Sequence, residues 1–204
     1  MTTHYTTSGI ILRSEDRGEA DRVFAVFTRD YGKLLFWAIA ERKITSKLRG
    51  GLELFSLSNL EFIQGKNRKV VTEAITVKPY SFIRKDVAPM YVAYRIADLV
   101  DFLCKGEESE QKLWSLLEET FDALNVSKAP YTPLYYYFLF NALEVLGYKP
   151  SQDHCAECAN RFAIMLQYVY PLTKDRNQFE KVQWKGEDTK LLSSISRHYL
   201  TQFV

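Results

Sequence analysis

The fold is decided first by residues 22–40, RVFAVFTRDYGKLLFWAIA, in which two apolar runs flank a short turn. The runs are rich in Val, Phe and Leu, which favour extended chain when they alternate or cluster over a few residues. Asp30-Tyr31-Gly32 between them has the composition of a tight hairpin turn. The stretch therefore predicts two antiparallel strands, over residues 22–28 and 33–40.

Three more segments extend this pattern in both directions. Residues 8–13 form a short apolar run, and residues 52–64 and 68–77 alternate between apolar and polar, joined by a turn at 64–67. The segment at residues 33–40 is followed by a basic stretch, residues 41–51, which we interpret as a connector. In the segment at residues 52–64 the side chains expected to point inward are Leu52, Leu54, Leu57, Leu60 and Phe62. Five strands in the first 78 residues are the inventory of a small Greek-key barrel of the OB type.

After residue 79 the apolar period changes to 3.6, which predicts helices over 88–104, 111–126 and 133–146. Gly147 suits the C-terminal cap of the third. We therefore expect an α+β protein: a five-stranded OB barrel over 1–78 and a helical domain over 79–204. Within the second, residues 151–185 are expected to form a small finger-like remnant.

Composition excludes several classes of protein. The 204 residues are 47% hydrophobic and 25% charged, which is typical of a globular chain. No apolar run is long enough for a membrane helix, and the N-terminus does not resemble a secretory signal. Three cysteines fit reduced thiols, so a cytoplasmic protein is expected. No catalytic triad and no glycine-rich phosphate loop is present, so we expect no enzyme activity.

Charge is distributed unevenly along the chain. Residues 1–78 carry 13 Lys and Arg against 9 Asp and Glu, whereas residues 79–150 carry 7 against 10. Two basic groups stand out in the strand region, one at residues 42–49 and one at 66–69. Basic groups on an OB barrel neutralise phosphates and release counterions, which is how such barrels bind nucleic acid.

Aromatic side chains supply the second element of such a site, because unpaired bases stack on them. Phe36 and Trp37 are consecutive in a predicted strand, so they point to opposite faces. One of the two is expected in the core, and the other is a candidate for stacking.

Several ordered motifs in the first part resemble the RecO family of bacterial recombination mediators. They are Gly9–Arg13 (GIILR), Gly18–Arg22 (GEADR), Phe27-Thr28 before Tyr31-Gly32-Lys33, and Gly51 through Phe55-Ser56 with Leu60. Further along, Phe138, Leu143, Leu146 and Gly147 look like the family's helix before its cysteine segment. The resemblance covers most of the chain, and its motifs are most specific up to about residue 78.

The resemblance implies an OB domain that binds single- and double-stranded DNA, anneals complementary strands and helps to load recombinase onto coated strands. Its implied partners are RecR and the acidic tail of single-strand-binding protein. Combined with the charge pattern, it gives these expected DNA contacts: Arg13, Arg22, Lys33, Trp37, Arg42, Lys43, Lys47, Arg49, Lys66, Arg68 and Lys69.

The sequence departs from the family pattern in two places. Zinc-binding members have two CxxC pairs, whereas here Cys155 and Cys158 form one pair and no cysteine follows. A structural zinc normally takes four ligands, so we expect no metal or other cofactor, with these two cysteines as its ligands if a zinc site survives. Where the family places basic side chains for the acidic tail, residues 135–137 are tyrosines.

Two other functions remain open at this point. The chain could be a protein-interaction adaptor of the same pathway that binds little DNA itself, since its helical part is acidic. It could also bind RNA, because stacking and phosphate contacts do not distinguish RNA from DNA unless a 2′-hydroxyl is recognised.

Overall fold

The computed structural model describes residues 3–104, 106–126 and 131–148, together with 190, 192, 193, 196, 197 and 200. The chain divides into two compact units, residues 1–127 and 128–204, which are described separately below. The predicted finger at 151–185, with Cys155 and Cys158, lies outside the described residues.

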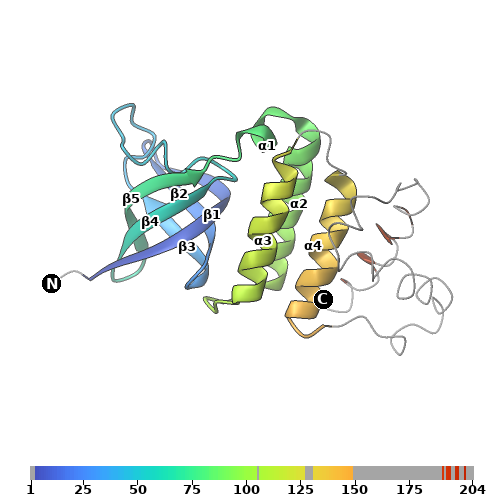
Figure 1. Ribbon diagram of the computed structural model, residues 1–204. Helices are drawn as coiled ribbons and strands as arrows, with labels where there is room; N and C mark the ends of the chain where they lie inside the picture. Colours follow the sequence, from blue (N-terminus) through green and yellow to red (C-terminus); the bar gives the residue numbers. More distant parts are fainter. Residues whose placement is uncertain are drawn as a thin grey trace. The chain divides into compact units, whose positions relative to one another are not determined.

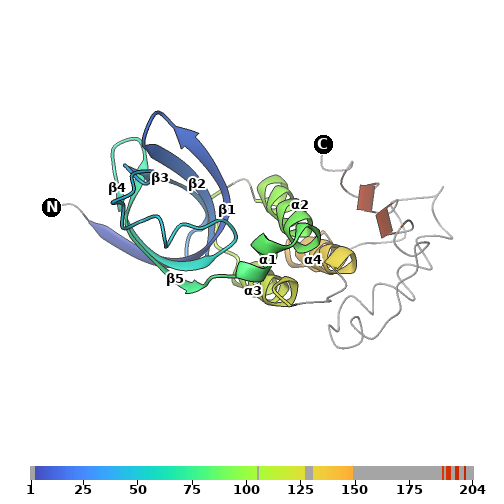
Figure 2. The same ribbon diagram turned by 90° about the horizontal axis from the view of Figure 1, so that it is seen from above.

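The first unit begins with five strands: β1 (His4–Arg17), β2 (Asp21–Thr28), β3 (Gly32–Ala38), β4 (Leu57–Gln64) and β5 (Lys69–Lys78). They close into a barrel in the order β1-β2-β3-β5-β4 (Figures 1 and 2). Every pair is antiparallel except β3 with β5, which is parallel. This architecture confirms the predicted five-stranded OB barrel.

Two predicted strand boundaries were wrong. β1 is longer than residues 8–13, because its second half continues as a hairpin with β2, in which Arg17 lies opposite Asp21. The side chains of residues 13–17 are all exposed, so no apolar alternation marks them as a strand. The segment at 52–64 is extended only from Leu57 onward, because Phe55 has a φ of 63° and breaks the strand.

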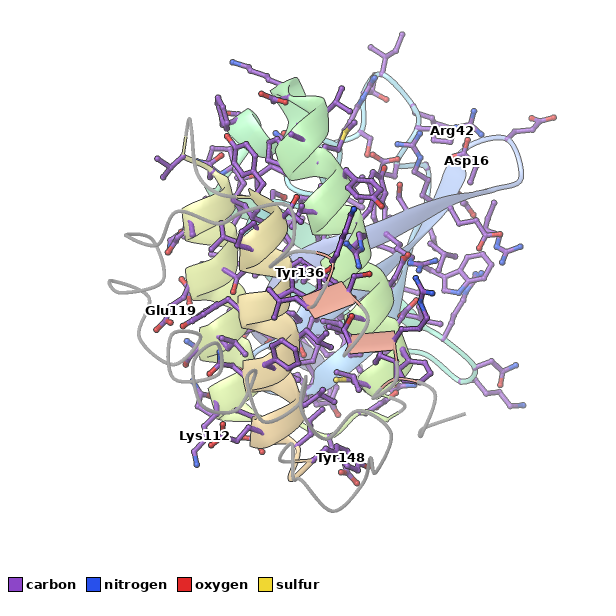
Figure 3. The ribbon with its side chains drawn as sticks, turned by 90° about the vertical axis from the view of Figure 1, so that its right-hand side faces the viewer. Asp16, Arg42, Lys112, Glu119, Tyr136 and Tyr148 are labelled. Carbon is purple, nitrogen blue, oxygen red and sulfur yellow. The ribbon has the colours of Figure 1, made fainter. Side chains whose placement is uncertain are left out.

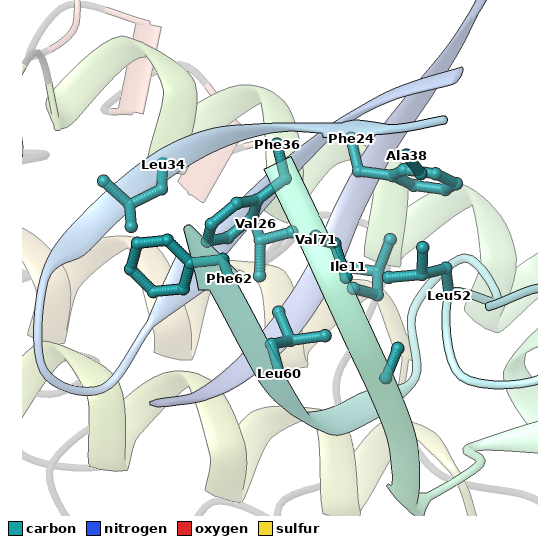
Figure 4. Close-up of a cluster of buried hydrophobic side chains, with 11 residues drawn as sticks. Ile11, Phe24, Val26, Leu34, Phe36, Ala38, Leu52, Leu60, Phe62 and Val71 are labelled. Carbon is teal, nitrogen blue, oxygen red and sulfur yellow. The ribbon is translucent and has the colours of Figure 1, made fainter. Parts of the chain in front are cut away.

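The barrel interior holds a continuous cluster of apolar side chains, shown in Figure 4. Phe36 is fully buried in it, so the outward residue of the pair is Trp37. Leu52 reaches the cluster from the connector that joins β3 to β4, so part of the core comes from an irregular segment. The members are Ile11, Phe24, Val26, Leu34, Phe36, Ala38, Leu52, Leu60, Phe62, Val71 and Ala74.

Gly51 marks the point where the connector lies against β5. A Cβ atom at Gly51 would stand 2.1 Å from the Ala74 carbonyl oxygen. We therefore expect Gly51→Ala to lower the free energy of unfolding by about 1–3 kcal/mol, since backbone has to move. Gly50→Ala is the matched control, because nothing lies within 4 Å of its Cβ. Urea unfolding measures both, and equal stability of the two variants would contradict the close approach.

Three helices complete the first unit: α1 (Ser81–Lys85), α2 (Val87–Leu103) and α3 (Gln111–Leu124). The Asp86 carboxylate caps α2 by accepting a hydrogen bond of 2.9 Å from the Ala88 N–H. The predicted helical periods are confirmed, and α3 buries a stripe of apolar residues that includes Leu113, Leu117 and Phe121. None of the described helices is both long and apolar enough to cross a membrane.

The barrel and these helices are joined by aromatic and charged contacts. Phe55 stacks edge-on against Tyr94 of α2, and its ring also lies 6.0 Å from that of Phe121. Lys78, the last residue of β5, donates to Glu118 at 2.8 Å and to Asp122 on α3. The Glu118 hydrogen bond, with the smaller effect of Asp122, raises the pKa of the Lys78 ammonium.

The described part of the second unit contains α4 (Tyr131–Val145), whose residues 133–140 are all buried. The helix ends as predicted at Gly147, which has a φ of 86°. The Gly147 N–H donates to the Glu144 carbonyl and the Tyr148 N–H donates to the Leu143 carbonyl, at 3.0 and 2.7 Å. This is a Schellman cap with glycine at the left-handed position.

Candidate nucleic-acid interface

The outer face of β3 is unusually apolar for a solvent-facing strand. Leu35 and Trp37 face outward on the strand and Ile39 follows directly after it, and Leu35 is 60% exposed. Trp37 is half-buried and pairs across the sheet with Val23 of β2 and Val70 of β5. The Arg68 guanidinium carbon lies 4.7 Å from the centre of the Trp37 ring, in the geometry of a cation–π contact.

The turn between β4 and β5 carries the second predicted basic group, and its members differ in their surroundings. Lys66 is exposed, and no ion pair to it occurs among the described residues. Arg68 covers Trp37. Lys69 is only 19% exposed and is paired with Glu107 of the α2–α3 loop at 2.6 Å. The turn therefore offers Lys66 and Arg68 to a ligand, while Lys69 is already neutralised.

The connector at residues 39–56 carries the first predicted basic group. Arg42 lies beside Asp16, at 3.5 Å, and donates to the Gly18 carbonyl (Figure 3). Arg22 donates to the same Asp16 at 2.7 Å. The Arg22 hydrogen bond, with Arg42 nearby, holds the pKa of the Asp16 carboxyl below its usual value.

The remaining cations of the connector have no such partners. Lys43, Lys47 and Arg49 are exposed and form no ion pair within the described part of the chain. Their neighbour Ile44 is 92% exposed, whereas Leu48, between Lys47 and Arg49, packs against the barrel core. A polyanion therefore finds three unneutralised cations here.

Arg13 and Lys33 are held by the helices instead. The Lys33 ammonium donates to Asp101 of α2 at 2.9 Å and is only 18% exposed. Arg13 is paired with the carboxylates of Asp98 and Asp101. These two residues fasten the barrel to α2. With Lys69, Arg22 and Arg42, five of the predicted contacts already face carboxylates.

The two groups of unpaired cations adjoin the outer face of β3 from two elements, the β4–β5 turn and the connector. β5 runs parallel to β3, with Phe36 opposite Lys69, so the turn before β5 lies toward the start of β3. The connector leaves from the end of β3, after Ala38. The outer face around Trp37, the sixth of the seven residues of β3, therefore connects the β4–β5 turn to the connector.

Part of this arrangement escaped the sequence analysis. The outward positions of Leu35 and Ile39 were not picked out, although they alternate with the inward Phe36 and Ala38. The apolar run KLLFWAIA hides that alternation, because both of its faces are apolar. The stacking of Arg68 on Trp37 has no local signal, since the two residues come from different strands.

The tyrosines of α4 and the cysteines contribute no further contact to this candidate site among the described residues. Tyr135, Tyr136 and Tyr137 of α4 are all buried, so they present little surface to a tail peptide. In the described part of the chain no group of three or more His, Cys, Asp or Glu residues is placed to hold a metal ion. Cys104 is half-buried, and burial raises the pKa of its thiol.

The closed barrel and the helices after it define an OB-fold protein with a helical second part. Two family models cover most of the sequence: the N-terminal part of recombination protein O matches residues 1–80, and the C-terminal part matches residues 84–171. The chain belongs to the RecO family of bacterial DNA repair proteins.

Curated relatives agree with this assignment. The chain is 36% identical over 154 residues to the DNA repair protein RecO of Roseiflexus sp., which covers 76% of this chain and 54% of the relative. It is 32% identical over 167 residues to the DNA repair protein RecO of Dehalococcoides mccartyi, and the match covers 82% of this chain and 66% of the relative. It is 29% identical over 182 residues to the DNA repair protein RecO of Gloeothece citriformis, and that match covers 88% of this chain and 64% of the relative. The chain thus spans about half to two thirds of the length of these relatives.

Proposed function

We propose that this chain binds single-stranded DNA along the outer face of β3 and promotes the annealing of complementary strands. The observation that carries the proposal is the exposed apolar face around Trp37, with unpaired cations in the adjoining β4–β5 turn and connector. In many OB folds the face of strands 2 and 3 and the adjoining loops bind oligonucleotides, which is the same part of the barrel.

The physical mechanism needs no covalent chemistry. Lys66 and Arg68 in the turn and Lys43, Lys47 and Arg49 in the connector would neutralise phosphates, and Trp37 offers a ring for a base to stack on. The exposed part of this face runs from Leu35 to Ile39, so it is roughly 13 Å long at ~3.3 Å per residue. That length suits a few nucleotides, the low end of the ~4–16 that an OB fold binds. With its phosphates neutralised, the held strand repels a complementary strand less.

Lys66 and Lys69 provide a matched test within one turn. Lys66→Ala is expected to lower the affinity for a labelled single strand and to reduce the slope of log K against log salt by about 0.7, the value for one lost phosphate contact. Lys69→Ala removes the same charge, but from a side chain that Glu107 already holds. Its slope is expected to stay close to that of the unaltered protein, and equal effects of the two substitutions would argue against this site.

Within the same proposal, the chain acts as a recombination mediator in the bacterial cytoplasm and not as an enzyme. It would bind double-stranded as well as single-stranded DNA. Its partners would be RecR and the acidic tail of single-strand-binding protein, and the tail would bind away from the buried tyrosines of α4. We propose that it needs no metal or cofactor. Measuring the zinc content of the purified chain tests this, because Cys155 and Cys158 would be the ligands of any bound zinc.

One observation favours a second function, that of an adaptor with little DNA binding of its own. The cations Arg13, Lys33 and Lys69 face carboxylates of the helical segment and are therefore withdrawn from DNA. Titration of a labelled strand at low and at physiological salt separates the two functions. Salt-sensitive binding by the chain alone supports the first, and binding only in the presence of RecR supports the adaptor.

A further inference from the structure

A cavity of about 260 Å³ lies at the end of the barrel where the connector crosses β1 and β2. Phe24 and Leu52 give it an apolar floor, and both are almost completely buried. Three arginines, Arg22, Arg49 and Arg84, lie around it together with Glu41. The cavity is slightly smaller than the ~300 Å³ at which pockets for drug-sized ligands begin, so it suits a group of the size of one nucleobase.

Glu41 carries a polar atom with no hydrogen-bond partner. Its side chain is 2% exposed, and its Oε2 accepts no hydrogen bond from any described residue. The Nη1 atom of Arg22 lies 3.4 Å from this oxygen and forms an ion pair with it but no hydrogen bond, while the Nε–H of the same guanidinium donates to Asp16. Buried acceptors are almost always satisfied, so a ligand with an N–H donor fits this position.

The three arginines are not equally available. The guanidinium of Arg84 donates to the carboxylate of Glu53 and to the carbonyls of Leu54 and Pro79. Arg22 is held by Asp16. Arg49 is exposed and forms no ion pair with the residues that the structure describes. The cavity thus offers one acceptor without a hydrogen bond, Glu41 Oε2, and one free cation, Arg49.

We propose that this cavity receives one unstacked nucleotide of a bound strand. The base donates an N–H to Glu41 Oε2, and its phosphate lies beside Arg49. The proposal rests on the proposed DNA binding and adds a preference among bases. Cytosine, adenine and guanine carry exocyclic amino donors, whereas thymine has only a ring N–H flanked by two carbonyl oxygens that would face the carboxylate. A basic side chain of a partner protein fits less well, because the surrounding arginines would repel it.

The test compares two labelled 20-mers on the full chain, one of thymidine alone and one with every fourth thymidine replaced by deoxycytidine. The unaltered protein is expected to bind the cytosine-containing strand roughly tenfold more tightly, as one charge-assisted hydrogen bond allows. In Glu41→Gln this preference is expected to fall below about twofold, because a neutral amide oxygen is a weaker acceptor than a carboxylate.

Glu119→Gln is the matched control, since it makes the same change of charge at an exposed position of α3 that does not line the cavity. It is expected to keep the preference. If the unaltered protein binds both strands equally, the cavity proposal is overturned while strand binding stands, and this comparison does not depend on any variant folding. A preference that survives in Glu41→Gln also overturns it and assigns Glu41 to the fold or to a protein partner. No binding of either strand overturns the proposed function as well.

Discussion

Replacing Lys43, Lys47 and Arg49 together with alanine is expected to weaken binding of a single strand about fiftyfold at ~0.15 M salt. Each lost phosphate contact removes about 0.7 from the salt slope, so the triple variant is expected to lose about 2. The loss of affinity should be similar for DNA strands of different sequence, because these cations are expected to contact phosphates, which carry no sequence information. Arg42 is left out, since it already lies beside Asp16.

The control for this triple variant is a second one with the same change in net charge. Arg29 of the β2–β3 turn (which is paired with Asp30), Lys85 of α1 and Lys112 of α3 are exposed in the same unit and belong to neither the connector nor the β4–β5 turn. Their replacement by alanine is expected to change the slope by less than ~0.5, through the general field of the protein alone. Fluorescence anisotropy over a range of salt concentrations measures both, and an unchanged slope in the connector variant would remove the connector from the site.

Phe55→Ala is expected to have the largest effect on stability, a loss of about 3–5 kcal/mol in the free energy of unfolding. Phe55 is completely buried and packs against Tyr94 of α2 and Phe121 of α3. Its N–H also donates to the Ile11 carbonyl in β1 at 2.8 Å, so the residue is tied to the barrel and to both helices. Alanine keeps that hydrogen bond and loses the packing.

Urea unfolding followed by circular dichroism and by tryptophan fluorescence measures this loss. Tyr91→Ala is the control, because it removes an aromatic ring from α2, the helix that carries Tyr94. The Tyr91 ring is 61% exposed, so the free energy of unfolding is expected to change by less than ~0.5 kcal/mol. Leucine at position 55 should recover part of the stability by refilling the space. A loss below about 1 kcal/mol in Phe55→Ala would show that the barrel and helices do not depend on this contact.

The elements with a clear local period were predictable from sequence. The hairpin at Asp30–Gly32, the buried stripe of α3 and the glycine cap of α4 each depend on residues that are neighbours in the chain. The outer half of β1 was missed because pairing with β2, and not burial, makes it a strand. Such pairing leaves no apolar pattern to detect.

The candidate site was predictable only in part, for the same reason. The basic groups and the aromatic pair at Phe36 and Trp37 are visible in the sequence. The neutralisation of Lys33 by Asp101 is not, since the two residues are 68 positions apart. Charge counts along the chain therefore identified the basic segment but did not separate the free cations from those that hold α2.

The parallel contact between β3 and β5 has a thermodynamic consequence. It consists of only two residue pairs, Phe36 with Lys69 and Trp37 with Val70, whereas β1 and β2 are paired along most of their length. The barrel is therefore closed along a short seam, and Trp37 lies on that seam with Arg68 over it. A DNA strand that stacked on Trp37 as proposed would contact this seam. Its binding energy then adds to the stability of the closed barrel, and closure in turn favours binding.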